Sequence, residues 1–527
     1  MAGYCLKHVR QNNPNTIAGN TLWYALDASA TTVVMLIASV PVARVMGPSV
    51  LGHYIYLLFL TGTAQRLANF GLPATCCKYM AEFLGRQEYA IAHEVFRVTF
   101  RYQATISGII TAVGLCLAAF SEPEYRLITV LIVLSMWPAM ISYIPGQANI
   151  AAENLRANVP ASITYLATYS ALVVLTLMMN WGLIGLATAT LISRVLEAAV
   201  RYFGVLRWLR GYPTRALPAL LRSRMLNFSR HNLILLALGL IVWDRSEVFF
   251  LKQFSDVRQV AFYSLAFSIT NQLLMAPRSL SFATGMSILA QYGRDPRRLS
   301  PLMRNAIRYV SVLTIPLFLG TAAIAEPLIH STYGNHYLSV VPVLCILCIS
   351  SLTRAFQPHT ENLLQATEQQ GFMVKWLAIT AVLNVSLDAL LIPKYGAVGA
   401  AVANGLAQTI GITGLFYKAG GAYAMRSQLR FLGALLLSGA VMVCVVIKLV
   451  RLLPPGPGLF AGIGVGALVF LLGLRTTRSL EQEDWDRLRQ WTRLLPTPVH
   501  RIVPALISRL VSDSGREPAI ASPRADQ

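Results

Sequence analysis

Apolar stretches of about 20 residues recur along all 527 residues of the chain, separated by short polar loops. A bilayer core of ~30 Å requires about 20 apolar residues in a helix, because backbone polar groups cannot remain unpaired in lipid. The pattern therefore predicts an all-α polytopic membrane protein with about 14 transmembrane helices. The expected spans are 20–43, 48–72, 97–119, 127–148, 161–180, 182–203, 229–251, 258–288, 307–325, 337–357, 372–392, 396–418, 429–449 and 457–474.

Lys and Arg are concentrated in alternate loops, which predicts an orientation. The N-terminal segment carries Lys7 and Arg10, and the loops after even-numbered spans are much richer in Lys and Arg than the loops after odd-numbered spans. Because Lys and Arg near helix ends resist translocation, we expect both termini to be cytoplasmic. This topology accounts for most of the formal charge of +21. Nucleic-acid binding would instead require a soluble basic domain, so we expect no nucleic-acid partner.

Several other classes of protein are disfavoured. The first apolar run is too long for a cleavable signal peptide and lacks a small-residue exit site, so we interpret it as an anchor. Cys345 and Cys348 form a C-x-x-C pair within an apolar span, but no second pair accompanies them, and we expect the seven cysteines to be packing residues rather than metal ligands. The sequence contains no P-loop, so ATP hydrolysis is disfavoured. We expect no cofactor and no metal.

The two halves of the chain resemble each other. Residues 181–187 (Trp-Gly-Leu-Ile-Gly-Leu-Ala) and 395–401 (Tyr-Gly-Ala-Val-Gly-Ala-Ala) match at an offset of 396 − 182 = 214. Tyr54 and Tyr263, at the beginnings of the second and eighth expected spans, match at an offset of 263 − 54 = 209. Near-constant offsets predict a duplication. Because each half contains six spans, the repeats would be parallel, with a substrate site at their interface, as in many secondary transporters.

This repeat predicts two pseudo-symmetric six-helix bundles plus two C-terminal helices. The C-terminal tail contains Trp485, Leu488 and Trp491 at helical spacing, which is typical of an amphipathic helix lying in the membrane interface. The expected units are an N-terminal bundle (1–203), a cytoplasmic amphipathic linker (204–228), a C-terminal bundle (229–420), two further helices (421–475) and a cytoplasmic tail (476–527).

Three segments carry a family resemblance. They are residues 43–54 (Ala-Arg-Val-Met-Gly-Pro-Ser-Val-Leu-Gly-His-Tyr), Asp244-Arg245 followed by 249–263, and residues 391–401 (Leu-Ile-Pro-Lys-Tyr-Gly-Ala-Val-Gly-Ala-Ala). In this order and with this number of spans, the chain resembles the polysaccharide-transporter (Wzx-type) oligosaccharide flippases of the multidrug/oligosaccharidyl-lipid/polysaccharide exporter superfamily. The resemblance covers about residues 15–420.

The resemblance implies a V-shaped pair of bundles that works by alternating access in the inner (cytoplasmic) membrane. The implied cargo is an oligosaccharide on a polyprenyl pyrophosphate, flipped to the outer leaflet for O-antigen, capsule or exopolysaccharide synthesis. Membrane lipids, a polysaccharide polymerase and chain-length machinery are the implied partners. The lipid II flippase branch also has fourteen helices, but its charged pattern is not evident here.

Charged residues within the spans are candidate site residues, because an Arg or Asp at mid-helix costs roughly 2.5–3.5 kcal/mol on insertion scales. Arg66 lies within the second span, and the offset of 209 carries it to position 275, about one turn from Arg278. Two guanidinium groups there would suit a pyrophosphate or an acidic sugar. Arg245 and Arg354 are further candidate substrate-binding residues. The alternatives are pairing with carbonyls or helix ends, and, for Arg354, anchoring at the interface beside His359 and Glu361.

Two acidic residues are candidates for energy coupling. Asp27 in the first span would be protonatable if desolvated, or would be a hydrogen-bonded structural residue. Asp244 either serves coupling, neutralises charges of other helices or lines an outer cavity. Arg194, Glu197 and Arg201 recur at spacings of three and four, which predicts intrahelical ion pairs rather than a binding site.

Two rival functions remain. A multidrug or cation antiporter of the same fold would prefer an acidic cavity, whereas the surplus within the spans is basic. A polyprenyl-linked glycosyltransferase or polysaccharide polymerase would need a catalytic domain or sizeable outer loops. Asp484 and Asp486 form an acidic pair, but they begin a tail helix, where acidic side chains favour the positive end of the dipole. We therefore expect a transporter and no enzyme.

Overall fold

The computed structural model describes residues 14–243, 246–275, 277–278, 299–367, 369–419 and 428–477, and the side chains of residues 14–38 are not included. The described residues are all-helical and contain no strand, which confirms the predicted fold class. Nine of the described helices are long and apolar enough to cross a membrane, or ten if the bent pair Ile307–Ala323 and Ala325–Thr332 is one span. The chain is thus a multi-pass membrane protein. The total of 14 spans stays a prediction.

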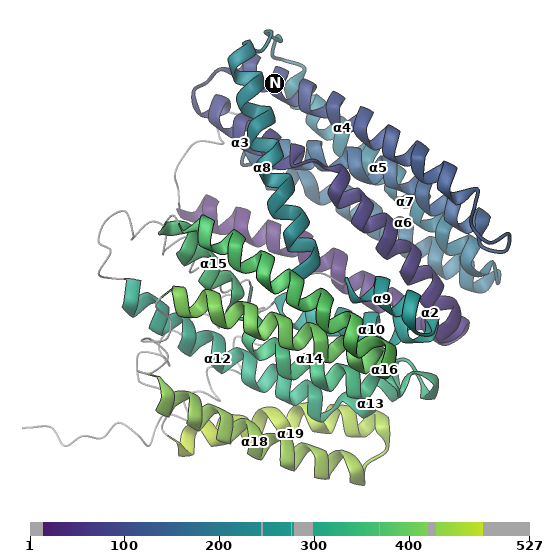
Figure 1. Cartoon of the computed structure of the whole chain (residues 1–527), viewed down its shortest axis with the longest axis vertical. Helices are drawn as coiled ribbons and strands as arrows, with labels where there is room; N and C mark the ends of the chain where they lie inside the picture. Colours follow the sequence, from purple (N-terminus) through teal and green to yellow (C-terminus); the bar gives the residue numbers. More distant parts are fainter. Residues whose placement is uncertain are drawn as a thin grey trace, which may run out of the picture.

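Among the described residues, six helices belong to the first bundle and eight to the second; Figure 1 shows how the bundles are arranged. The first comprises α2 (Pro14–Ala68), α3 (Leu72–Gly85), α4 (Tyr89–Ala118), α5 (Arg126–Ala151), α6 (Val159–Met178) and α7 (Gly182–Leu209). The second comprises α8 (Ala219–Trp243), α9 (Glu247–Phe254), α10 (Val257–Leu273), α12 (Leu299–Ala323), α13 (Ala325–Thr332), α14 (Val340–Arg354), α15 (Gln357–Ala366) and α16 (Gln370–Lys418). The last two described helices, α18 (Leu429–Leu452) and α19 (Pro455–Thr476), pack against α12 and α13.

Two of these helices are long enough for two membrane crossings, and each contains a sharp bend. At 1.5 Å per residue, the 49 residues of α16 would extend about 73 Å, more than twice the bilayer core. The backbone leaves the helical region at Gly396 (φ 55°, ψ −130°). In α2 the same occurs at Gly47 (φ 74°), directly before Pro48. The bends fall where one expected span ends and the next begins. Glycine is favoured at both positions because the backbone φ angle there is positive.

The glycine turns also support the internal repeat. Gly182 begins α7 with φ 59°, and its repeat partner Gly396 has φ 55°. Three residues further on, a Cβ on Gly185 would lie 2.4 Å from the Thr176 side chain, and a Cβ on Gly399 would lie 2.4 Å from the Leu391 carbonyl oxygen. The two matched segments therefore share their backbone conformation and their need for close packing, as duplicated segments should.

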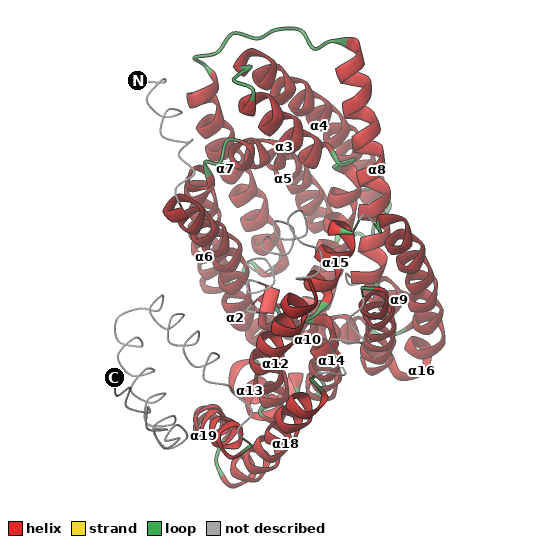
Figure 2. Ribbon diagram, turned by 90° about the vertical axis from the view of Figure 1, so that its left-hand side faces the viewer, coloured by secondary structure: helices red, strands yellow, loops and turns green. Residues whose placement is uncertain are grey.

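The bundles meet at one end of the molecule, which we call the closed end, and their helices diverge toward the other (Figure 1). At the closed end one hydrophobic cluster includes Leu51 and Tyr54 of the first bundle and Val260 and Tyr263 of the second. A Cβ on Gly52 would lie 2.2 Å from the Val257 carbonyl oxygen, so the two backbones approach closely there. Figure 2 shows the same two bundles from the side, with α18 and α19 at the far end of the second bundle.

The connection between the bundles runs through α8. This helix packs against α3 of the first bundle and against α16 of the second. Near its beginning, the Arg224 carbonyl accepts a hydrogen bond from the Tyr79 hydroxyl (3.3 Å), and the Lys78 ammonium lies 4.0 Å from the Phe228 ring centroid. The expected linker 204–228 includes the end of α7 and the beginning of α8, with residues 210–218 between them. The expected tail 476–527 lies almost entirely outside the described residues.

Candidate functional site

The structure brings two of the predicted cations, Arg278 and Arg354, into one neighbourhood. Arg354 is the last residue of α14, is only 5% exposed, and places its guanidinium carbon 5.2 Å from the ring centroid of Phe267 on α10. Arg278 follows α10 and lies within electrostatic range of both Arg354 and Glu361. Glu361 is an acidic counterpart for Arg278, so this pair is balanced in charge.

The other predicted site residues are placed less completely. Arg66 lies in the last turn of α2, where its Nε atom donates to the Gly62 carbonyl oxygen of its own helix (3.4 Å). Asp27 lies in the first crossing of α2, where the structure describes only the backbone. Asp244 and Arg245 lie outside the described residues, between α8 and α9. The roles assigned to these four residues stay predictions.

A buried acidic centre, which sequence reasoning missed, lies in the second bundle. Glu247 of α9 is fully buried, and its carboxylate accepts hydrogen bonds from three side chains. Its Oε2 atom accepts the Tyr263 hydroxyl (2.8 Å), and its Oε1 atom accepts the amides of Asn404 (2.7 Å) and Asn384 (3.3 Å). Asp388 lies one turn after Asn384 on α16 and interacts electrostatically with Glu247. We call these five residues the acidic centre.

Asp388 is the residue of the acidic centre that most requires a ligand. It is 0% exposed, and within the described part of the chain neither carboxyl oxygen has a hydrogen-bond partner. The acidic centre itself contains two carboxylates and no cation, and Arg354 lies within electrostatic range of one of them, Glu247. Because an uncompensated buried charge is very costly, the residual negative charge favours binding a monovalent cation or a proton.

The sequence contained a signal for both acids. Glu247 lies within the expected span 229–251, and Asp388 lies within the expected span 372–392. The rule that selected Asp27, an acidic side chain inside an apolar span, selects both of them equally. Their partners Asn384, Asn404 and Tyr263 are uncharged, and only the packing of α9, α10 and α16 shows that they belong to the same group.

The first bundle contains a second polar group, which we call the basic centre. On α7, Glu197 pairs with Arg194 (Nη1 to Oε2, 2.8 Å) and with Arg201 (Nη2 to Oε1, 3.0 Å), which confirms the predicted intrahelical pairs. The Arg194 guanidinium carbon lies 4.2 Å from the ring centroid of Tyr165 on α6. The basic centre is defined as Arg194, Glu197 and Arg201 of α7 with Tyr165 and Tyr169 of α6, whose rings stack 5.8 Å apart, and Tyr54 of α2.

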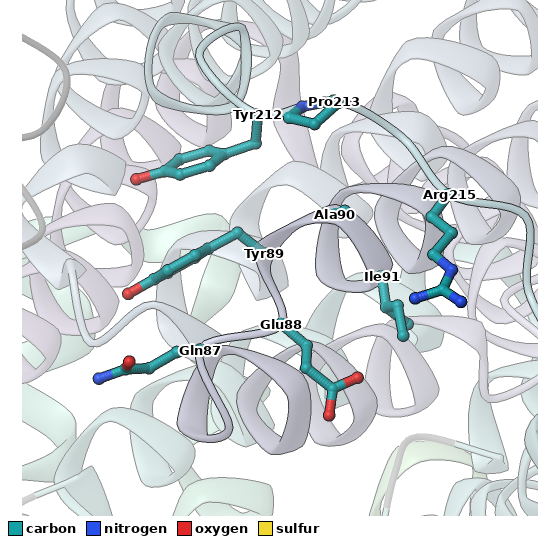
Figure 3. A pocket seen from close by; sticks show the side chains of 8 residues that line it. All are labelled: Gln87, Glu88, Tyr89, Ala90, Ile91, Tyr212, Pro213 and Arg215. Atoms are coloured by element: carbon teal, nitrogen blue, oxygen red, sulfur yellow. The ribbon is translucent and has the colours of Figure 1, made fainter.

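A pocket of about 380 Å³ lies away from both centres, where the turn between α3 and α4 faces residues 212–215 (Figure 3). The Tyr89 and Tyr212 rings stack with centroids 4.7 Å apart, and His93 Nδ1 donates to the Tyr212 carbonyl oxygen (2.8 Å). These contacts attach the connection between the bundles to the first bundle. The pocket contains none of the predicted site residues; its lining residues are Gln87, Glu88, Tyr89, Ala90, Ile91, Tyr212, Pro213 and Arg215.

A family model described as polysaccharide biosynthesis protein matches residues 41–342, which is more than half of the chain. The chain belongs to this polysaccharide biosynthesis protein family. Among curated relatives of this family member, the probable low-salt glycan biosynthesis flippase Agl15 of Haloferax volcanii is 22% identical over 440 residues, covering 81% of the chain and 89% of Agl15. The probable flippase AglR of the same organism is 27% identical over 166 residues, covering 30% of the chain and 34% of AglR.

Solved structures establish the fold of this polysaccharide biosynthesis family member. The lipid II flippase MurJ in an inward closed conformation superposes with a TM-score of 0.67 at 14% identity, covering 86% of the chain and 98% of MurJ. An inward-facing multidrug resistance MATE transporter superposes with a TM-score of 0.62 at 15% identity, covering 74% of the chain and 95% of the transporter. The chain therefore shares its fold with these two transporters.

Proposed function

We propose that the protein flips a polyprenyl-pyrophosphate-linked oligosaccharide from the cytoplasmic to the outer leaflet of the cytoplasmic (inner) membrane, for the synthesis of a cell-surface polysaccharide. Family membership and the similarity to two probable flippases support a flippase role. The orientation inferred from loop charges places the closed end outside and both termini in the cytoplasm. A polysaccharide polymerase and chain-length machinery would then be downstream partners.

The observation that carries this proposal is the way in which the two bundles are joined at the closed end. The Tyr337 hydroxyl donates to the Ala43 carbonyl oxygen (3.1 Å), and the Ser39 hydroxyl lies 3.2 Å from that of Tyr333. Arg44 Nε donates to the Thr332 carbonyl oxygen (2.6 Å), at the end of α13. Such non-covalent contacts are reversible, so exchanging them for contacts at the opposite end would give alternating access.

The acidic centre would couple this cycle to an ion gradient. One monovalent cation or proton would neutralise the residual charge on Glu247 and Asp388. Because the binding residues belong to three helices, α9, α10 and α16, occupancy would stabilise one packing of the second bundle over another. An ion gradient could thereby favour one of the two orientations. Asp388 and Glu247 are our proposed coupling residues, in addition to the predictions for Asp27 and Asp244.

The acidic centre also favours a second candidate function, a multidrug or cation antiporter. A buried carboxylate pair without a fixed cation for each acid would accept a cationic compound as well as a small ion. We rank this function second because the first bundle contains a surplus of positive charge in its basic centre. The two functions differ in what accumulates when the protein is removed.

The test uses cells that lack the protein. Lipid-linked saccharides are extracted, and the side of the membrane on which they reside is determined with a membrane-impermeant oxidant. Accumulation of a polyprenyl-pyrophosphate saccharide on the cytoplasmic face, reversed by restoring the gene, is the expected result, and mass spectrometry then identifies the cargo. Unchanged lipid-linked saccharides together with new sensitivity to cationic compounds would overturn the flippase and support the antiporter.

A further inference from the structure

The internal repeat relates the two polar centres residue by residue. The offset of 209 carries Tyr54 to Tyr263, and the offset of 214 carries Thr190 to Asn404. In the first bundle the Tyr54 hydroxyl lies 2.9 Å from Thr190 Oγ1, so the repeat-related helices meet through the tyrosine. In the second bundle Tyr263 and Asn404 meet through the carboxylate of Glu247. The two centres therefore occupy equivalent places in the two bundles.

The charges of the two centres differ one helical turn after Thr190 on α7 and after Asn404 on α16. The offset of 214 carries Arg194 to Gln408, which is 3% exposed, so a guanidinium stands where the second bundle has an amide. In the opposite direction, the offset carries Asp388 back to Val174. The first bundle thus has a cation that its repeat lacks, and it lacks a carboxylate that its repeat contains.

The described side chains of the basic centre do not balance one another. Glu197 is shared between Arg194 and Arg201, so two guanidinium groups face one carboxylate. The face of Tyr165 offers Arg194 the negative part of its quadrupole, but it contributes no formal charge. Because an unbalanced charge within a membrane bundle is costly, the basic centre favours an anion.

Arg194 has hydrogen-bond donors that such an anion could use. Glu197 engages only Nη1, and within the described ranges Nε and Nη2 of Arg194 have no hydrogen-bond partner. The Arg194 side chain is 31% exposed, whereas Glu197 beside it is 7% exposed. Glu197 and Tyr165 therefore hold the guanidinium in place while two of its donors remain available. A guanidinium fork binds a carboxylate or a phosphate through two parallel hydrogen bonds.

We propose that Arg194 binds an anionic group of the transported lipid-linked saccharide, either the carboxylate of an acidic sugar or the phosphate of the carrier, and so selects charged cargo. Glu197 and Tyr165 are positioning residues that hold the guanidinium for this contact. The inference rests on the proposed flippase function and assigns the anion-recognising role to α7 of the first bundle.

The test measures binding to the purified full-length protein in lipid nanodiscs. Farnesyl pyrophosphate represents the carrier phosphate, and glucuronic acid represents an acidic sugar. We expect wild type to bind at least one probe, and Arg194→Gln, which installs the residue of the repeat, to bind that probe at least about 10-fold more weakly. Arg207→Gln, the same change at an exposed position of α7, is the matched control and should bind as wild type does.

The probe whose binding is lost identifies the anionic group. Arg194→Lys keeps the charge that pairs with Glu197 and should preserve the fold, but it loses the fork, so we expect about 3- to 10-fold weaker binding. Wild-type affinity in both Arg194 variants would overturn the proposal, and so would a wild-type protein that binds neither probe. The flippase function is judged separately by the sidedness of lipid-linked saccharides in cells, which uses neither probe.

Discussion

The two bundles contain polar centres at equivalent places, and the charges of these centres are opposite. The acidic centre contains two carboxylates, Glu247 and Asp388, and the guanidinium of Arg354 lies within electrostatic range of Glu247. In the basic centre two guanidinium groups, those of Arg194 and Arg201, face one carboxylate. The two centres therefore lie on repeat-related helices, whereas the residual charge of their described side chains differs in sign.

The centres also differ in exposure, which bears on the size of a ligand. Asp388 is 0% exposed, which favours a proton or a small desolvated cation as its ligand. The Arg194 side chain is 31% exposed, which favours a larger ligand than the one at Asp388. This difference favours a division of work, in which the second bundle couples transport to an ion and the first bundle recognises cargo. Four predictions test this division.

The largest expected effect on the rate of flipping is that of a substitution at Asp388. Asp388→Asn removes the residual negative charge with little change in volume, so we expect cation-driven flipping in proteoliposomes to fall by about 100-fold, near the upper limit for coupling between sites. Glu326→Gln, at an exposed position of α13, is the control and should leave the rate unchanged. If Asp388→Asn flips at the wild-type rate with the same gradient dependence, the second bundle does not couple the ion.

A cation placed one helical turn after Asn404 of the acidic centre should have a smaller effect on flipping. Gln408→Arg copies the residue of the first bundle into the second, and the added guanidinium would compete with the coupling cation. We expect the concentration of cation required for half-maximal flipping to rise about 10-fold, which corresponds to about 1.4 kcal/mol. Gln408→Met removes the amide without adding charge and serves as the control. An equal rise in both variants would mean that packing, rather than charge, was responsible.

The repeat-related tyrosines provide the same chemical change in both centres. Tyr263→Phe removes a hydrogen bond to a buried carboxylate, for which the typical contribution is about 1.5–3 kcal/mol. Tyr54→Phe removes a hydrogen bond to a neutral hydroxyl, for which about 0.5–1.5 kcal/mol is typical. Thermal unfolding in detergent should therefore show the larger loss of stability for Tyr263→Phe. Equal losses would contradict an ionised Glu247.

The smallest effect on transport is expected at the closed end, where residues of both bundles contact each other. Arg44→Ala removes the side chain that donates to the Ser331 and Thr332 carbonyls, an exposed contact for which about 1 kcal/mol is typical. We expect the population open at this end to rise about 5-fold. The measurement is the distance between spin labels at Ser49 and Asn335 in a variant without the seven native cysteines.

Arg126→Ala is the matched control for this measurement. Arg126 is an exposed arginine at the first position of α5. The Arg126→Ala variant should therefore show the same distance distribution as wild type. If Arg44→Ala also leaves the distribution unchanged, the Arg44 contacts do not hold the closed end. A comparable shift in both variants would indicate a general effect of lost charge.

Much of the fold could be predicted from the sequence. The break between the expected spans 372–392 and 396–418 falls at Gly396, and the pairing of residues 181–187 with 395–401 appears as a shared positive φ at Gly182 and Gly396. The intrahelical pairs of Glu197 follow from helical spacing alone. All these features depend on neighbours within a few residues or on direct repetition, and a sequence displays both.

The candidate site could be predicted only in part. Arg278 and Arg354 were selected because each lies in an expected span or at its end, and the structure shows that they interact with each other. Glu247 and Asp388 meet the same criterion, but the sequence does not show which buried charges lie close together. Without that information, Asp244 appears as suitable as Glu247, only three residues away.

The sequence by itself determined that this protein is a helical membrane protein with two related halves, because a bilayer imposes its requirement on each helix separately. Only the tertiary structure decided which polar side chains form a centre and with what residual charge. Asn404 and Glu247 are 157 residues apart and become partners only when α16 packs against α9. In lipid the balance of charge within such a group, rather than any one residue, determines which ligand it requires.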